Sequence, residues 1–312
     1  MVFTMKASRK FLAPLFVLVL ALAALAFTAC NSGSEEEIDP AGVVSSVTLN
    51  QTSAFLSASE GAENGSVALT ATLDLSEEGA EVDTTWSTSN GAVASVSGGT
   101  VTAVGNGVAV ITATAGNKSA TCVVAVTDTV VSDAAGLASA AAAAQNGAVI
   151  ALREGTYAGD VTFNANAQNV SLVGAGASSV TVQGSVTFAG GGSCFLSGMT
   201  VTAEGKESAV SVSGAGASLE LRHASLGGAV YGAKLALSSE SGGDGSTLRV
   251  YDSSFTDVWC ALYADSVGAL LRTSFTGVTY QYGSAGGYCP AFGDAAETDV
   301  NVPSAGEQTD AA

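Results

Sequence analysis

The stretch SDAAGLASAAAAAQNGAVIALREGTYAGDVTFNANAQNVSLVGAG, residues 132–176, decides the fold of the larger part of this chain. Residues 132–146 are rich in alanine, a serine and an aspartate can cap the start of a helix there, and a glycine can end it. Short apolar and β-branched runs follow at 148–152, 161–163 and 170–174, separated by turn residues. The closing Gly-x-Gly lacks the third glycine and the following helix of a nucleotide-binding fingerprint. The stretch therefore predicts one helix followed by short strands.

Four later segments share one spacing of apolar residues when they are aligned on their last residue. The segments are 194–201, 219–226, 248–255 and 268–275. The residues 7, 5, 2 and 0 places before that last residue are expected to point inward. Inward residues of one strand are two places apart, so the odd spacing of three between places 5 and 2 predicts a bend there. The intervals of 25, 29 and 20 residues fit one coil per repeat. Each coil buries its inward side chains only by stacking on the next, so several coils are needed for a core.

The order helix, buried strand, Gly-Thr-Tyr, strand, polar turn, strand resembles the start of right-handed parallel β-helix domains, including those of pectin-degrading enzymes. The resemblance implies such a domain over residues 129–290. A pectate-lyase-like site needs an aspartate-rich calcium cluster with an arginine base, and a pectin-esterase-like site needs two aspartates with supporting Gln and Arg. Neither set can be matched residue by residue in this sequence.

Residues 43–128 alternate apolar and polar residues in short runs broken by Gly, Asn and Ser, which is typical of a β-sandwich. The segments at 86–90, 93–97, 99–104 and 107–113 follow one another as in a bacterial Ig-like domain of group 2, which this part of the chain resembles. That family occurs mostly in bacterial surface and adhesion proteins and has no catalytic centre, so the resemblance implies no site residues. We expect Trp86 to anchor the sandwich core. The fold class expected for the chain is all-β: an Ig-like β-sandwich followed by a short right-handed parallel β-helix with an N-terminal capping helix.

Residues 1–29 resemble a bacterial lipoprotein signal peptide. A basic start precedes the apolar run 11–27, and the sequence AFTAC ending at Cys30 resembles a lipobox with Phe where Leu is commonest. The resemblance implies that Cys30 carries the acyl chains and is the lipid attachment site. An ordinary secretory signal with an incidental cysteine is the alternative reading.

The segments next to the two predicted domains are acidic. Residues 30–42 are expected to form a tether and residues 291–312 a disordered tail. With the lipid anchor, these features predict an extracytoplasmic protein of the cell envelope, at the outer membrane or the cell surface.

The charge of the chain limits its partners. It has 312 residues, with 10 Lys and Arg against 28 Asp and Glu, and a formal net charge of −18. Such a chain repels nucleic acid and anionic headgroups, so the lipid itself is expected to make the membrane contact. Four cysteines follow the predicted anchor, at 122, 194, 260 and 289, with no CxxC spacing and one histidine in the chain, so a zinc site is not expected. Cys122 and Cys194 read as small buried apolar residues, and the disulfide pairing is left open.

The repeat alignment places three polar residues at the same position, three residues before the end of a repeat: His223, Asp252 and Arg272. Neighbouring coils lie about 4.8 Å apart, so these side chains would stack in a column. One interpretation is a sugar- or uronate-binding column, and the other is a polar turn position. No resident cofactor is expected, and a Ca²⁺ bound by Asp252, Asp257 and Asp265 is left open.

Aromatic residues gather in the C-terminal third of the chain, and Tyr251 and Trp259 are the candidates nearest the polar column. Exposed rings stack on sugar faces, so a glycan platform is one interpretation. Closure of the solenoid core is the other.

These observations predict a membrane-anchored, non-enzymatic binding or adhesion module for glycan or protein. The sandwich would be its stalk and the β-helix its outermost part. The alternatives are a polysaccharide lyase, esterase or hydrolase acting through the β-helix face, and an architectural envelope protein.

Overall fold

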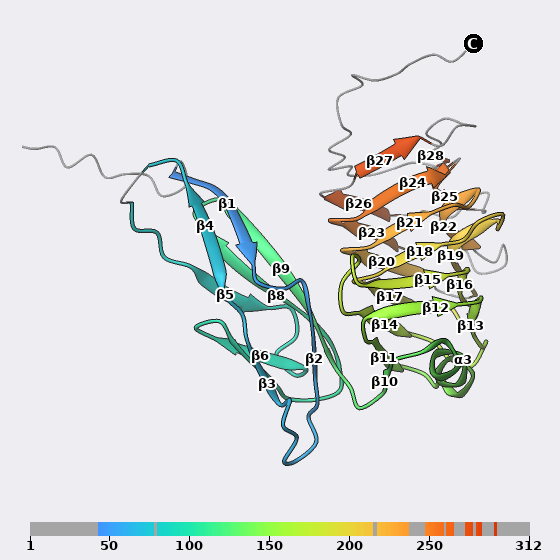
Figure 1. Cartoon of the computed structure of the whole chain (residues 1–312), viewed down its shortest axis with the longest axis horizontal. Helices are drawn as coiled ribbons and strands as arrows, with labels where there is room; N and C mark the ends of the chain where they lie inside the picture. Colours follow the sequence, from blue (N-terminus) through green and yellow to red (C-terminus); the bar gives the residue numbers. More distant parts are fainter. Residues whose placement is uncertain are drawn as a thin grey trace, which may run out of the picture.

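The computed structural model describes residues 43–77, 80–214, 217–236, 247–258, 260–264, 272–276, 279–282 and 290–291. They form two β domains that lie side by side, with the N-terminal domain in blue to teal and the C-terminal domain in green to orange (Figure 1). No helix in the described ranges is long and apolar enough to cross a membrane. The predicted signal peptide, Cys30, the acidic tether and most of the acidic tail lie outside these ranges.

The N-terminal domain is a small β-sandwich. One sheet consists of β2 (Ser53–Leu56), β9 (Lys118–Val126), β8 (Gly107–Ala115) and β5 (Thr85–Thr88). The facing sheet consists of β3 (Ser66–Ala68), β7 (Thr100–Ala103) and β6 (Ala94–Ser97). A separate pair is formed by β1 (Val44–Leu49) and β4 (Ala71–Leu75). Apolar residues of the two facing sheets form one core, including Ile111, Val124 and Val101. Trp86 is partly buried and packs against this core and against the one beneath β1 and β4. Trp86 thus packs against the core as predicted, but its ring is not fully buried.

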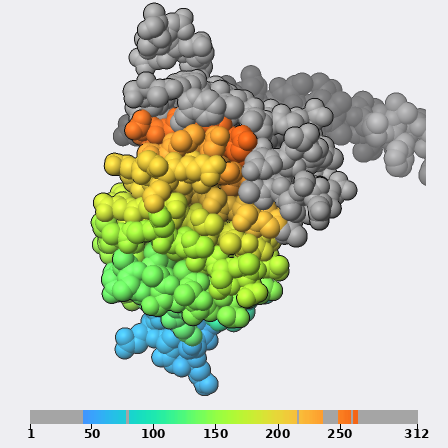
Figure 2. Space-filling model, turned by 90° about the vertical axis from the view of Figure 1, so that its right-hand side faces the viewer, coloured from blue at the N-terminus to red at the C-terminus, as the bar shows by residue number. Residues whose placement is uncertain are grey.

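The C-terminal domain is a parallel β-helix built from three sheets. The first sheet consists of β10 (Val130–Val131), β11 (Val149–Leu152), β14 (Ser171–Gly174), β17 (Ser193–Ser197), β20 (Ser218–Arg222), β23 (Thr247–Tyr251) and β26 (Arg272–Thr276). The second consists of β12 (Gly155–Ala158), β15 (Val180–Gln183), β18 (Thr200–Thr202), β21 (Ser225–Gly227), β24 (Ser254–Val258) and β27 (Thr279–Tyr282). The third consists of β13 (Val161–Phe163), β16 (Val186–Phe188), β19 (Ser208–Ser213), β22 (Tyr231–Ala236), β25 (Cys260–Ala264) and β28 (Pro290–Ala291). The coils stack in sequence order, from green to orange in Figure 2, and the predicted all-β fold class is confirmed.

Alternating apolar residues fill the interior and repeat from coil to coil. Val161 and Phe163 of β13 lie in register with Val186 and Phe188 of β16. The two phenylalanine rings stack with their centroids 5.0 Å apart and their planes 5° from parallel. Stacking of this kind joins the inward residues from Leu137 to Leu262 into one continuous core.

Helix α3 (Ala134–Ala143) covers the N-terminal end of this core, as the alanine-rich run predicts. The side chain of Asp133 caps it by accepting the backbone N–H of Gly136 at 2.7 Å. Leu137 and Ala141 face inward and are buried in the same cluster as the first coil. The helix therefore shields the open end of the solenoid from water.

The structure corrects the alignment of the fourth predicted repeat. Phe275 pairs with Val250, and Tyr280 pairs with Phe255, so the last repeat ends 25 residues after Phe255. Arg272 consequently lies beside Thr247 and not beside Asp252. Both alignments direct apolar residues inward, because a period-2 pattern fits more than one register. The continuous hydrogen-bonded ladder of the first sheet selects between them.

The sandwich packs against the outer face of the first solenoid sheet. Val123 of β9 is buried against Val173 of β14. Just past the end of β9, the hydroxyl of Thr127 donates to the carbonyl of Val149 in β11 at 2.7 Å. Successive parts of one sandwich strand thus contact successive coils, and β9 runs across the solenoid strands. The sandwich thus covers one flank of the solenoid (Figure 1), and its predicted role as a stalk stays a prediction.

Candidate functional site

The predicted polar column lies at the corner between the first and second solenoid sheets. His223 and Asp252 both have φ of 47°, and Gly198 in the preceding coil has φ of 67°. Gly, Asn, Asp and His are the residues most often found in this left-handed region. The corners also bond to one another, because the backbone N–H of His223 donates to the carbonyl of Tyr251 at 3.2 Å. The structure therefore brings His223 and Asp252 together as turn residues.

The other predicted residues of this set are not joined to the column. Arg272 pairs with Thr247, as described above, and its side chain lies outside the described part. Trp259 and Asp265 also lie outside it. Within the described residues no three His, Cys, Asp or Glu side chains are grouped as metal ligands.

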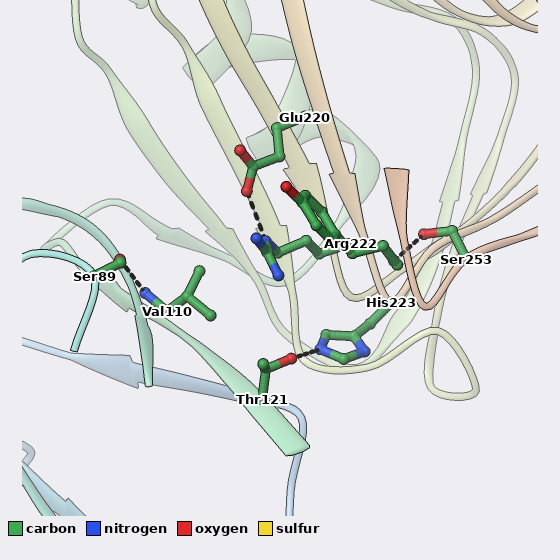
Figure 3. Close-up of polar contacts among 8 residues, drawn as sticks. Ser89, Val110, Thr121, Glu220, Arg222, His223 and Ser253 are labelled. Carbon is green, nitrogen blue, oxygen red and sulfur yellow. Dashed lines mark hydrogen bonds and ion pairs between the residues drawn. The ribbon is translucent and has the colours of Figure 1, made fainter. Parts of the chain in front are cut away.

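His223 reaches across to the sandwich. Its Nε2 lies 2.9 Å from the hydroxyl of Thr121 in β9 (Figure 3). Burial between the domains lowers the pKa of His223; Arg222 lowers it further, while the carboxylate of Asp252 acts in the opposite direction. The ring is therefore neutral at pH 7 and serves as a polar contact between the two domains.

Tyr251 lies on the outer face of the first sheet, directly beside Arg222 of the neighbouring strand. The guanidinium carbon of Arg222 is 3.7 Å from the centroid of the Tyr251 ring, and its Nε donates to Glu220 at 2.6 Å (Figure 3). The arginine thus covers one face of the ring that the sequence predicts as a sugar platform. The three side chains therefore lie together on the outer face of this sheet.

A groove of about 370 Å³ lies between the first solenoid sheet and the sandwich. Its lining residues are Ser89, Asn90, Val108 and Val110 from the sandwich and Ser171, Ser193, Cys194, Phe195, Ser218, Leu219, Glu220 and Arg249 from the solenoid. The sandwich wall is fixed by the backbone N–H of Val110, which donates to the hydroxyl of Ser89 at 2.9 Å. The volume lies within the range of small-molecule sites, about 300–1,000 Å³. Both domains are needed to form it.

Arg249 is the exposed cation of this groove. It lies opposite Glu220 on the neighbouring strand, but the Glu220 carboxylate is bound to Arg222. Among the described residues Arg249 has no ion-pair partner. The groove therefore offers a guanidinium with unused hydrogen-bond donors.

The buried cysteines contribute no nucleophile to the groove. Cys122 and Cys194 are free thiols, Cys260 is buried, and Cys289 lies outside the described residues. Burial raises the pKa of Cys122 to about 12 and that of Cys194 to about 11. Both thiols therefore stay protonated at neutral pH and pack as apolar residues, as the sequence predicts for Cys122 and Cys194.

Sequence reasoning missed the groove and its arginine. The signal is present in the strand patterns SLELR and TLRVY, where charged residues occupy the outward positions between apolar ones. An outward position, however, normally faces solvent. Only the docking of the sandwich turns this part of the sheet into one wall of a groove.

Comparisons with known proteins do not assign this chain to a family. No family model matches it, and no curated protein matches it. Among solved structures, it is similar to a PL6 family polysaccharide lyase from Pseudopedobacter saltans, with 13% identity and a TM-score of 0.36 over 49% of this chain and 47% of that one. The aligned part thus spans about half the length of the lyase, and a likeness of this degree carries no activity to this chain. The resemblance of residues 43–128 to bacterial Ig-like domains of group 2 stays a prediction.

Proposed function

We propose that this protein is a lipid-anchored, extracytoplasmic binding module that holds a glycan in the groove between its two domains. The observation that carries the proposal is the composition of the groove, in which Ser89 and Asn90 of the sandwich face Ser193, Phe195 and Arg249 of the solenoid. Hydroxyl, amide and guanidinium groups bind sugar hydroxyls, and an aromatic ring packs on the apolar face of a sugar. A protein surface is the other partner class that the sequence suggests.

A side chain that fills the groove tests this proposal. Ser193 is exposed at the groove, so Ser193→Trp fills it without entering the solenoid core. The matched control is Ser178→Trp, at an exposed corner residue that does not line the groove. We expect the full-length protein in detergent to bind glycans on an array and Ser193→Trp to abolish that binding, with Ser178→Trp unchanged. Unchanged binding by Ser193→Trp would place the ligand elsewhere, and release of reducing ends from a bound glycan would favour an enzyme.

The anchor is tested separately. We expect radiolabelled palmitate to be incorporated into the wild-type protein in a bacterial host and not into Cys30→Ser. Absence of label in the wild type would favour an ordinary secretory signal.

A further inference from the structure

Positive charge is scarce in this chain and is concentrated beside the groove. Seven Lys and Arg residues follow residue 30, against 28 Asp and Glu in the whole chain. Two of the seven, Arg222 and Arg249, fall on the neighbouring strands β20 and β23 of the first solenoid sheet. In an acidic protein such a local concentration of cations attracts anions to one place on the surface.

The groove region holds more arginine than carboxylate side chains. Glu220 is the carboxylate that lines it, and its ion pair with Arg222 at 2.6 Å leaves Arg249 without a partner among the described residues. Asp252 does not supply one, because it lies at the corner with His223 and does not line the groove. An incoming carboxylate would complete the arrangement of two arginines around two carboxylates.

The remaining lining is that of a carbohydrate site more than of a peptide site. Hydroxyl-bearing residues occur on both walls, with Ser89 on one side and Ser171 and Ser193 on the other. Phe195 contributes a partly buried ring between them. Sugar rings present hydroxyl groups at their edges and C–H groups on their faces, which match these two kinds of lining.

We infer that the groove binds a saccharide that carries a carboxylate, and that Arg249 binds this carboxylate. The inference rests on the proposed function and adds the charge of the ligand and the residue that selects it. The guanidinium presents two N–H donors in the plane of a carboxylate, a geometry that an ammonium group cannot reproduce.

The test compares uronate tetrasaccharides with their carboxyl-reduced, neutral counterparts by calorimetric titration of the full-length protein in detergent. We expect the acidic forms to bind, Arg249→Gln to weaken that binding about tenfold or more, and Arg249→Lys to restore it in part. Binding of the acidic forms should also weaken as the salt concentration rises. The matched control is Arg153→Gln, an exposed arginine that removes the same charge and does not line the groove.

The outcomes separate this inference from the proposed function. Equal affinity for acidic and neutral forms, unchanged affinity in Arg249→Gln, or no binding of any acidic tetrasaccharide would overturn the inference. If neutral glycans still bind and Ser193→Trp abolishes their binding, the proposed function stands and only the inference about the carboxylate is overturned. If Ser193→Trp alters the binding of no glycan, both are overturned.

Discussion

His223 shows how one residue can satisfy two structural demands. Its backbone takes the left-handed conformation of the solenoid corner, and its side chain bonds to Thr121 of the sandwich. A glycine would meet the first demand and not the second. The residue that the sequence singles out as a ligand candidate is, in this structure, a contact between domains.

The lowered pKa of His223 predicts a pH-dependent stability. Burial disfavours the charged ring, so the folded protein binds the proton less readily than the unfolded chain, whose value is near 6.5. The stability is therefore complete above about pH 6.5 and falls as the pH is lowered through that value. We expect urea unfolding to show a lower stability at pH 5.5 than at pH 7.5 in the wild type and a smaller loss in His223→Asn, since asparagine also tolerates this backbone conformation. Equal losses in both proteins would assign the pH dependence to other groups.

Gly198 and Gly205 have nearly the same backbone conformation, with φ of 67° and 69°, but different surroundings. A methyl group at 198 would overlap the backbone carbonyl of Gly174 and lie 2.6 Å from the hydroxyl of Ser53, whereas at 205 it would meet nothing within 4 Å. We expect Gly205→Ala to cost about 1–2 kcal/mol for the backbone alone. Gly198→Ala should cost roughly 1–3 kcal/mol more, because neighbouring backbone would have to move. Chemical denaturation of both variants checks this, and equal losses would show that close packing at Gly198 contributes nothing.

Helix α3 covers the exposed apolar end that every solenoid has at its first coil. The first coil has no preceding coil to cover its apolar side chains, and α3 covers them with Leu137 and Ala141. The capping bond from Asp133 fixes where this helix begins.

The cap is open to a direct test. Asp133→Ala removes the acceptor for the N–H of Gly136 and should lower the free energy of unfolding by about 1 kcal/mol. Asp133→Asn retains a side-chain oxygen and should lose much less. Hydrogen exchange at residues 136–138 should accelerate in the alanine variant. Unchanged exchange there would mean that tertiary packing alone defines the start of the helix.

The whole molecule is one unit because the sandwich and the solenoid share a buried apolar cluster. Val123, Ala125 and Val173 are fully buried in it, and Phe55, Val108, Val110, Val149 and Phe195 pack around them. This contact also places Ser89 and Asn90 opposite Arg249, so the groove depends on the docking.

Disruption of the docking should separate the domains. Val173→Asp places a charge in the cluster and should cost at least about 2 kcal/mol. We expect calorimetry to show one transition for the wild type and two for the variant, with loss of glycan binding. The control is Val104→Asp, because Val104 is 54% exposed on the sandwich and should tolerate the charge. A single, unshifted transition in Val173→Asp would show that the cluster contributes nothing to docking.

The sequence by itself determined the local structure and its order along the chain. The alanine-rich run and its capping residues predicted the helix, the alternation of apolar residues predicted the strands, and the repeat predicted the parallel β-helix, because composition and side-chain periodicity are local properties of the sequence. The same periodicity left the register of the last repeat open, and Arg272 was misplaced as a result. Only the tertiary structure decided which outward side chains meet another domain, because serine and arginine on an outer strand face have the same sequence pattern whether they face solvent or a groove. The contact of His223 with Thr121 and the place of Arg249 in the groove therefore came from docking, which joins residues more than a hundred positions apart and has no periodicity in the sequence.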